Sequence, residues 1–178
     1  MRKSLLKIGY FVFDATEKHQ YFPGQNMVRI FLIGYFKVIF NLLKEKSLDI
    51  NLRIGTLYLN LDRIQTAKKY YDTASLSIKD DVGLTRVLIC LGNLYLKDGS
   101  NQMAIEYYEK ALSISPYKTT ILSNLAFANE KIGEYAKSLS YAEQSVKVAN
   151  EEKDLGHTIP PDKNVESLIR RLEKNTNL

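Results

Sequence analysis

The stretch that decides the fold lies at residues 91–116 and reads LGNLYLKDGSNQMAIEYYEKALSISP. Its apolar residues recur every three or four positions, which is the period of a helix with one buried face. Asp98-Gly99 interrupts this pattern near its middle and predicts a turn between two helices. Pro116 ends the second helix, because proline cannot continue the helical hydrogen-bond ladder. The stretch therefore predicts two helices packed against each other.

The same pattern occurs on both sides of this stretch. Counting back 37 residues or forward 34 residues brings matching positions into register. The aligned positions include Gly55 with Gly92, Tyr71 with Tyr108, and Gly133 with Gly99. A small residue such as Gly92 lets two helices cross closely, and Tyr108 then fills the space around the crossing. Because no single helix pair can bury both of its faces, we expect the three units to stack.

The three units resemble tetratricopeptide repeats, a family of helix pairs with a period of 34 residues. The middle unit, 85–116, carries the small, aromatic and turn positions of the family throughout. The first unit, 48–81, has Asp62 where the turn glycine usually stands. The resemblance implies an all-α fold, a right-handed solenoid of helical hairpins containing about three units.

The third unit, 119–150, departs most from the family pattern. Asn129 and Ala142 stand at the positions that carry bulky aromatic residues in the middle unit. A helix pair without those two rings needs other side chains to fill its interior. We therefore expect Tyr135 and Tyr141 to supply the aromatic packing there.

Two segments lie outside the repeats at 48–150. Residues 1–47 predict a degenerate helical hairpin that is apolar and basic: residues 1–50 hold eight Lys or Arg against four Asp or Glu. The remainder of the chain is nearly neutral, with seventeen against sixteen. Residues 151–178 predict a linker followed by a capping helix, whose apolar side faces the last repeat. The apolar residues of that helix are Val165, Leu168, Ile169 and Leu172.

The second helix of the N-terminal hairpin, expected at about 24–46, is apolar on most of its surface. Arg29 and Lys37 interrupt it, which argues against a transmembrane span. One interpretation makes the hairpin a degenerate fourth repeat, with Gly34 meeting the next unit. The other makes it a docking face for an anionic membrane surface or a hydrophobic partner. The candidate docking residues are Phe31, Tyr35, Phe36 and Phe40.

The sequence offers no catalytic arrangement, so we expect a protein that is not an enzyme. His19 and His157 lie in expected loops without the nucleophile that a hydrolytic triad needs. Cys90 lies within an expected helix, where a free cysteine is usually an inert apolar residue. Clustered Arg and Lys interleaved with aromatic residues are missing, which argues against nucleic-acid binding. We also expect no metal site and no cofactor.

The resemblance implies that the first helix of each unit lines a concave groove for a protein or peptide partner. The candidate groove residues are Arg53, Thr56, Arg86, Ile89, Asn93, Lys97, Asn124, Phe127 and Lys131. Basic and amide side chains favour an extended or helical peptide with an acidic segment. Asn93 and Asn124 match two asparagines of the family's carboxylate clamps, but Ile89 replaces the clamp lysine. This difference disfavours capture of a free C-terminus in that form.

These observations predict a non-enzymatic adaptor or scaffold that binds a protein segment in its groove and supports assembly of a complex. The alternative is an assembly factor or peripheral subunit of a membrane-bound complex, docking through residues 1–47. The start Met1-Arg2-Lys3 is similar to that of a signal peptide, but Lys7 interrupts the apolar core. We therefore expect an uncleaved, cytoplasmic protein, peripheral to a membrane in the alternative case. The sequence does not predict an oligomeric state.

Overall fold

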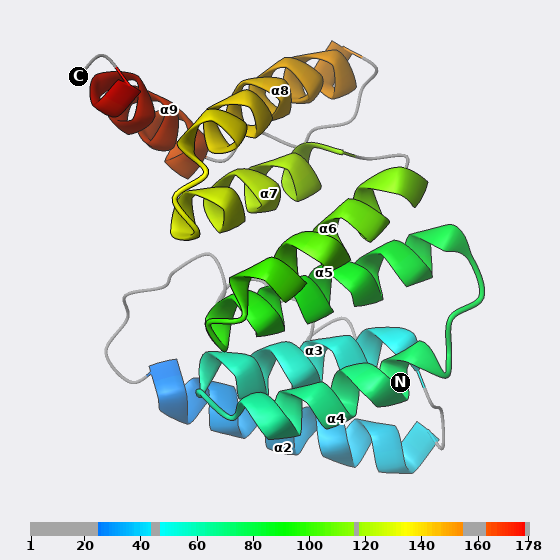
Figure 1. Cartoon of the computed structure of the whole chain (residues 1–178). Coiled ribbons are helices and arrows are strands. Elements are labelled where there is room, and N and C mark those ends of the chain that lie inside the picture. The colour runs from blue at the N-terminus through cyan, green and yellow to red at the C-terminus, as the bar shows by residue number, and fades with distance from the viewer. Residues whose placement is uncertain (1–24, 44–46, 116–117, 155–162, 177–178) are drawn as a thin grey trace. The chain divides into compact units, whose positions relative to one another are not determined.

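A computed structural model describes residues 25–43, 47–115, 118–154 and 163–176, and all regular structure in these ranges is helical (Figure 1). The helices are α2 (Gln25–Leu43), α3 (Leu48–Asn60), α4 (Ile64–Ser75), α5 (Asp81–Lys97), α6 (Asn101–Ile114), α7 (Thr119–Lys131), α8 (Tyr135–Asp154) and α9 (Lys163–Thr176). The chain divides into two compact units, Met1–Lys79 and Asp80–Leu178, here called the N-terminal and C-terminal units. The first part of the expected N-terminal hairpin, residues 1–24 with His19, lies outside the described residues, as do Pro116 and His157.

The core of the N-terminal unit forms where one side of α2 packs on α3. Its buried apolar residues are Leu32, Ile33, Phe36, Ile50, Ile54 and Leu57. Tyr58 of α3 and Tyr70 of α4 stack at its margin, with ring centroids 5.5 Å apart. The expected role of Gly34 is wrong, because it is exposed and a Cβ built on it meets no atom within 4 Å.

The pairs α3–α4 and α5–α6 share one packing device, as the repeat alignment predicts. Tyr71 lies over Gly55, and a Cβ on that glycine would fall 2.6 Å from Tyr71 Cδ1. Tyr108 lies over Gly92 in the same way, with a corresponding distance of 2.7 Å. Neither glycine can gain a methyl group unless a buried ring moves. Each tyrosine ring therefore occupies the space that its glycine leaves.

The turns of the three helix pairs are also equivalent, and all of them use a left-handed residue. Asp62, Gly99 and Gly133 have φ angles of 59°, 84° and 80°. In each turn the N–H of the following residue donates a hydrogen bond to the carbonyl oxygen five positions earlier, with N···O distances of 2.9 Å, 2.9 Å and 3.0 Å. This pattern satisfies the last carbonyl groups of the preceding helix. Asp62 thus takes the conformation of the turn glycine it replaces.

The C-terminal unit continues from α5–α6 through α7–α8 to α9. Val165, Leu168 and Leu172 of α9 are fully buried in one cluster with Ala126 and Ala142. The opposite side of α9 is exposed and charged, so α9 has the amphipathic character expected of a capping helix.

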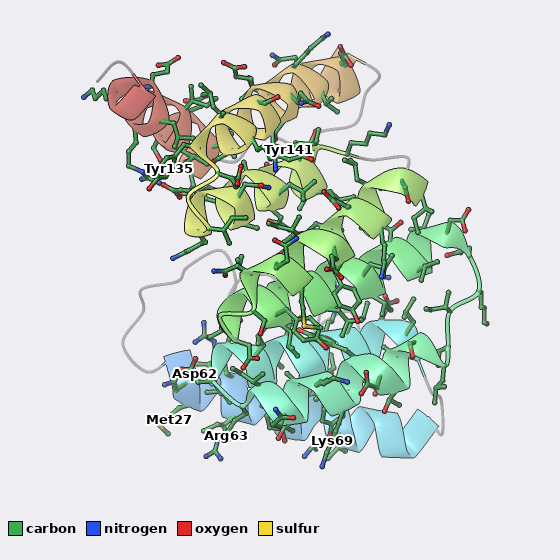
Figure 2. All side chains as sticks on the ribbon, viewed as in Figure 1. Met27, Asp62, Arg63, Lys69, Tyr135 and Tyr141 are labelled. Atoms are coloured by element: carbon green, nitrogen blue, oxygen red, sulfur yellow. The ribbon has the colours of Figure 1, made fainter. Side chains whose placement is uncertain are left out.

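The aromatic packing expected in the third helix pair is correct for only one of the two tyrosines. Tyr141 is half-buried and packs against two clusters, one formed by α6 and α7 and the other by α7, α8 and α9. Tyr135 begins α8 and is 48% exposed, so its packing role is a wrong prediction. Figure 2 labels both side chains. Asn129 is buried, and its Nδ2 donates to the Leu125 carbonyl at 2.8 Å, which explains how a polar residue occupies an aromatic position.

Two helices are longer than the sequence pattern predicts. α5 begins at Asp81, before the expected unit start at residue 85, because Asp80 Oδ1 accepts a hydrogen bond from the Gly83 N–H at 2.7 Å and caps the helix. α8 continues to Asp154, into the expected linker.

Candidate functional site

The structure brings together Asn93 of α5 and Asn124 of α7. Asn93 Oδ1 accepts a hydrogen bond from Asn124 Nδ2 at 3.4 Å and from the Tyr108 hydroxyl at 2.6 Å. Asn93 is exposed and Asn124 is half-buried. Because the Asn93 oxygen is already engaged, its amide nitrogen is the group that remains to donate to a backbone carbonyl of a bound segment.

The Tyr108 hydroxyl is held as a hydrogen-bond donor by its surroundings. Burial raises the pKa of Tyr108 above its ordinary value of 10.0, with Cys90 adding a smaller effect in the same direction. A buried phenolate is disfavoured because it loses its hydration. The proton therefore stays on Tyr108, and the short bond to Asn93 fixes that side chain.

The remaining groove residues of the C-terminal unit combine apolar and basic side chains. Ile89 is half-buried on the cluster of α6 and α7, and Phe127 is half-buried on the cluster of α7 to α9. Arg86 is half-buried, whereas Lys97 and Lys131 are exposed at the last turns of their helices. We call this set the α5–α7 surface; its members are Arg86, Ile89, Asn93, Lys97, Asn124, Phe127 and Lys131.

Arg53 and Thr56, the other two groove residues, belong to α3 of the N-terminal unit. Thr56 stands at the position equivalent to Asn93 and shares a hydrogen bond of 3.2 Å with the Tyr71 hydroxyl. Thr56 also donates to the Leu52 carbonyl at 3.0 Å. These tyrosine hydroxyls were not predicted from the sequence as partners of groove residues, although Tyr71 and Tyr108 at equivalent positions are the signal that could have revealed them.

The candidate docking residues on α2 lie in different environments. Phe31 is 69% exposed, Tyr35 is half-buried, and Phe36 is 0% exposed in the core of the N-terminal unit. Phe36 therefore cannot belong to a docking face, and this part of the prediction is wrong. The side chain of Phe40 lies outside the described residues. Met27, Ile30 and Val38 are exposed apolar residues of α2 that the prediction did not include.

Lys37 connects α2 to the aromatic residues at the margin of the N-terminal core. Its Nζ donates to the Tyr58 hydroxyl at 2.9 Å and lies 5.4 Å from the centroid of that ring. The hydrogen bond to Tyr58 is the main cause that raises the pKa of Lys37. Lys37 therefore remains charged at one side of the exposed part of α2.

Within the described ranges, the helices all fall short of the length or the apolar character that crossing a bilayer requires. This includes α2, which Arg29 and Lys37 interrupt.

Comparison with protein families identifies two of the helix pairs. Residues 85–118 and residues 48–78 each match a model described as a tetratricopeptide repeat. The two matches contain the Gly–Tyr packing device and the left-handed turn described above.

Similar curated proteins include two with functions stated in their names. Photosystem I assembly protein Ycf3 of Prochlorococcus marinus (strain MIT 9215) is 31% identical over 94 residues, covering 53% of this chain and 54% of Ycf3. BBSome complex member BBS4 of Bos taurus is 28% identical over 121 residues, covering 63% of this chain and 22% of BBS4. The chain thus spans about half the length of Ycf3 and less of BBS4.

Two solved structures support the fold. The crystal structure of MamA matches with a TM-score of 0.61 at 21% identity, covering 86% of this chain and 81% of MamA. The crystal structure of the APC/C hetero-tetramer Cut9-Hcn1 matches with a TM-score of 0.67 at 14% identity, covering 99% of this chain and 34% of the other. At these identities the likeness concerns the helical-hairpin fold alone.

Proposed function

The chain is a tetratricopeptide-repeat protein, and from that premise we propose that it is a non-enzymatic scaffold that binds a protein segment and supports assembly of a complex. The names of the relatives favour this role, since one is an assembly protein and another a complex member. We place the binding site for the segment on the α5–α7 surface. The junction of Asn93, Asn124 and Tyr108 is the observation that carries the placement.

The chemistry of the α5–α7 surface favours a peptide with acidic character. The fixed Asn93 amide suits a backbone carbonyl, and the half-buried Ile89 and Phe127 offer apolar contacts beside it. Arg86, Lys97 and Lys131 supply positive charge for carboxylates of the segment. A segment that uses all three kinds of contact gains both orientation and affinity.

Charge reversal on this surface tests the proposal. A photocrosslinking amino acid in place of Phe127 should trap the bound segment, and Arg86→Glu with Lys97→Glu should remove the crosslinked product. The matched control is Lys147→Glu with Lys174→Glu, because these exposed lysines lie on α8 and α9 and change the net charge equally. Circular dichroism should show an unchanged helical signal in both variants. Equal crosslinking in both variants would contradict this placement of the site.

A second role is favoured by the exposed apolar side of α2. We propose, as the alternative, an assembly factor or peripheral subunit of a membrane-bound complex that docks through residues 1–47, from a cytoplasmic location. Met27, Ile30 and Phe31 are each at least 60% exposed, which is unusual for large apolar side chains so close together. Met27→Asp with Phe31→Asp should release the protein from its complex in cell fractionation, while crosslinking through the α5–α7 surface persists.

A further inference from the structure

The solvent-facing side of α2 is an apolar stripe. Its members are Met27, Ile30, Phe31, Gly34 and Val38, all of them exposed. The opposite side of the same helix is buried on α3 through Leu32, Ile33 and Phe36. A helix that is apolar on both sides normally has both sides covered. Among the described residues, only α3 packs substantially on α2, so a second covering element is expected.

The spacing within the stripe fits a helix as its occupant. Met27, Phe31, Gly34 and Val38 follow one another at intervals of four, three and four residues, the seam of a coiled coil. Gly34 lies in the middle of this seam, and a Cβ built on it meets no atom within 4 Å. Glycine weakens a helix interior, and here it leaves a notch into which a side chain of a facing helix fits. A bilayer surface has no side chain to insert into such a notch.

The charge of the N-terminal unit indicates which side chains flank the seam of the facing helix. In the N-terminal unit the described residues include seven Lys or Arg against three Asp or Glu. Lys37 precedes Val38 on α2, and Figure 2 labels Met27, Arg63 and Lys69 along one edge of this unit in that view, with Asp62 close to Arg63. Acidic side chains beside the facing seam would complement this charge.

The same charge disfavours two other occupants. A second copy of the chain would bring the same excess of basic residues against this one, and like charges across an interface are repulsive. Residues 1–24 hold four Lys or Arg against two Asp or Glu, so they share the positive sign. A partner with acidic flanks avoids both conflicts.

We propose that the α2 stripe is a docking site for an amphipathic helix of a partner protein, with an apolar heptad seam flanked by acidic residues. This proposal specifies the partner in the second role described above and rests on it. Phe31 and Met27 fill the spaces between seam residues of the partner, and Gly34 receives one of those residues. The basic side chains Lys37, Arg63 and Lys69 pair with the partner's carboxylates.

Two synthetic helical peptides of about three heptads test the site. They share one Leu seam and differ only in flanking residues, Glu in one and Lys in the other. In fluorescence anisotropy with the full chain, the Glu peptide should bind at least about tenfold more tightly than the Lys peptide. Phe31→Asp should abolish binding, whereas Leu76→Asp should not, because Leu76 is an equally accessible apolar residue on the same unit (77% exposed). Equal affinity for the two peptides, or none for either, would overturn the proposal.

The variant Gly34→Leu distinguishes binding of a partner helix from binding of a membrane. It should weaken peptide binding at least about tenfold, because the leucine fills the notch. If vesicles of phosphatidylglycerol bind the chain and Gly34→Leu strengthens that binding, a membrane is the occupant and the proposal is wrong. Leucine favours a helix more than glycine does, so the variant should fold.

Maleimide labelling of the cysteine in Gly34→Cys tests whether another part of the chain covers the α2 stripe. With Cys90→Ser as background, maleimide should label the new cysteine rapidly in the full chain and slowly once the Glu peptide is bound. Slow labelling without peptide would mean that residues 1–24 already occupy the stripe, and would overturn the proposal. Repeating the titrations with Arg86→Glu and Lys97→Glu removes the α5–α7 surface as a second site for an acidic peptide. Binding that persists in this background and is lost with Phe31→Asp lies on the α2 stripe, so failure of this site and failure of the α5–α7 surface are distinguishable.

Discussion

The pairs α5–α6 and α7–α8 solve the same packing problem with different side chains. In α5–α6 the ring of Tyr108 lies against Gly92, where even a methyl group would overlap it. In α7–α8 the equivalent positions are Ala126 and Ala142, both fully buried. The two pairs thus fill their interiors differently: α5–α6 uses a glycine with a large ring, whereas α7–α8 uses two small methyl groups.

Buried serines accompany the two alanines of α7–α8. Ser138 donates to the Ala126 carbonyl at 2.8 Å, and its counterpart in α5–α6 is Ala104. Ser145 donates to the Thr119 carbonyl at 3.1 Å and shares a hydrogen bond of 2.7 Å with Ser123. The comparison teaches that one helix-pair architecture accommodates different interiors, in which the buried polar groups of α7–α8 are hydrogen-bonded to one another and to the backbone.

Tyr108→Ala should have the largest effect on stability. It leaves a cavity the size of a ring in α5–α6, and we expect a loss of about 3–5 kcal/mol in unfolding free energy, measured by urea titration. The control is Tyr107→Ala, since Tyr107 is only half-buried and should cost less. A loss equal to that of the control would mean that the ring does not fill the crossing.

Gly92→Ala should cost about 1–3 kcal/mol, because the methyl group displaces a buried ring. The sign should reverse when Tyr108→Ala is already present, since the methyl then fits and alanine favours the helix by about 1 kcal/mol. A double-mutant cycle measures this coupling. Additive effects would refute the idea that Ala126 and Ala142 compensate each other in α7–α8.

Ser138→Ala should cost about 1 kcal/mol, because the buried hydrogen bond to Ala126 is lost while the volume hardly changes. Ser140→Ala is the matched control on the exposed side of the same helix and should stay within about 0.5 kcal/mol of the parent. Thermal unfolding of both variants provides the measurement. If both lose stability equally, the loss at Ser138 does not come from its bond to Ala126, since alanine favours a helix more than serine does.

Tyr108→Phe should have the smallest effect, a loss of at most about 1 kcal/mol at neutral pH, because Asn93 is exposed and water can replace the hydroxyl. Burial raises the pKa of Tyr108 from its ordinary 10.0, so the folded state retains this proton longer than the unfolded state. The resulting stabilisation is complete below about pH 10 and is lost as the pH rises further. The difference between parent and variant in urea titrations should therefore shrink or reverse above pH 10, and a constant difference would contradict a burial effect.

The repeat alignment predicted the paired helices and their turns because those features depend on local chemistry. Spacing of apolar residues identifies a buried helix face, and Gly99 and Gly133 mark residues that need a left-handed backbone. Even Asp62, which lacks the usual glycine, was placed correctly by alignment. The apolar side of α9 was equally visible from the positions of Val165, Leu168 and Leu172.

Tertiary structure decided which side of each helix is covered. Phe31 and Phe36 are one residue type on one helix, yet the first is exposed and the second buried, because α3 packs on only one side of α2. From the sequence, Tyr135 and Tyr141 were equivalent candidates for the aromatic packing of α7–α8. In the structure only Tyr141 of the two packs against the core clusters.

Sequence alone was enough to predict the helix pairs of residues 48–150, because period, turn glycines and small–large residue pairs are local signals. Only the tertiary structure decided that the Tyr108 hydroxyl fixes Asn93 beside Asn124, and that an apolar stripe remains exposed on α2. Both outcomes depend on which helices pack against one another. A periodic pattern shows that a face is apolar, but the neighbouring helix determines whether that face is buried or remains available for a partner.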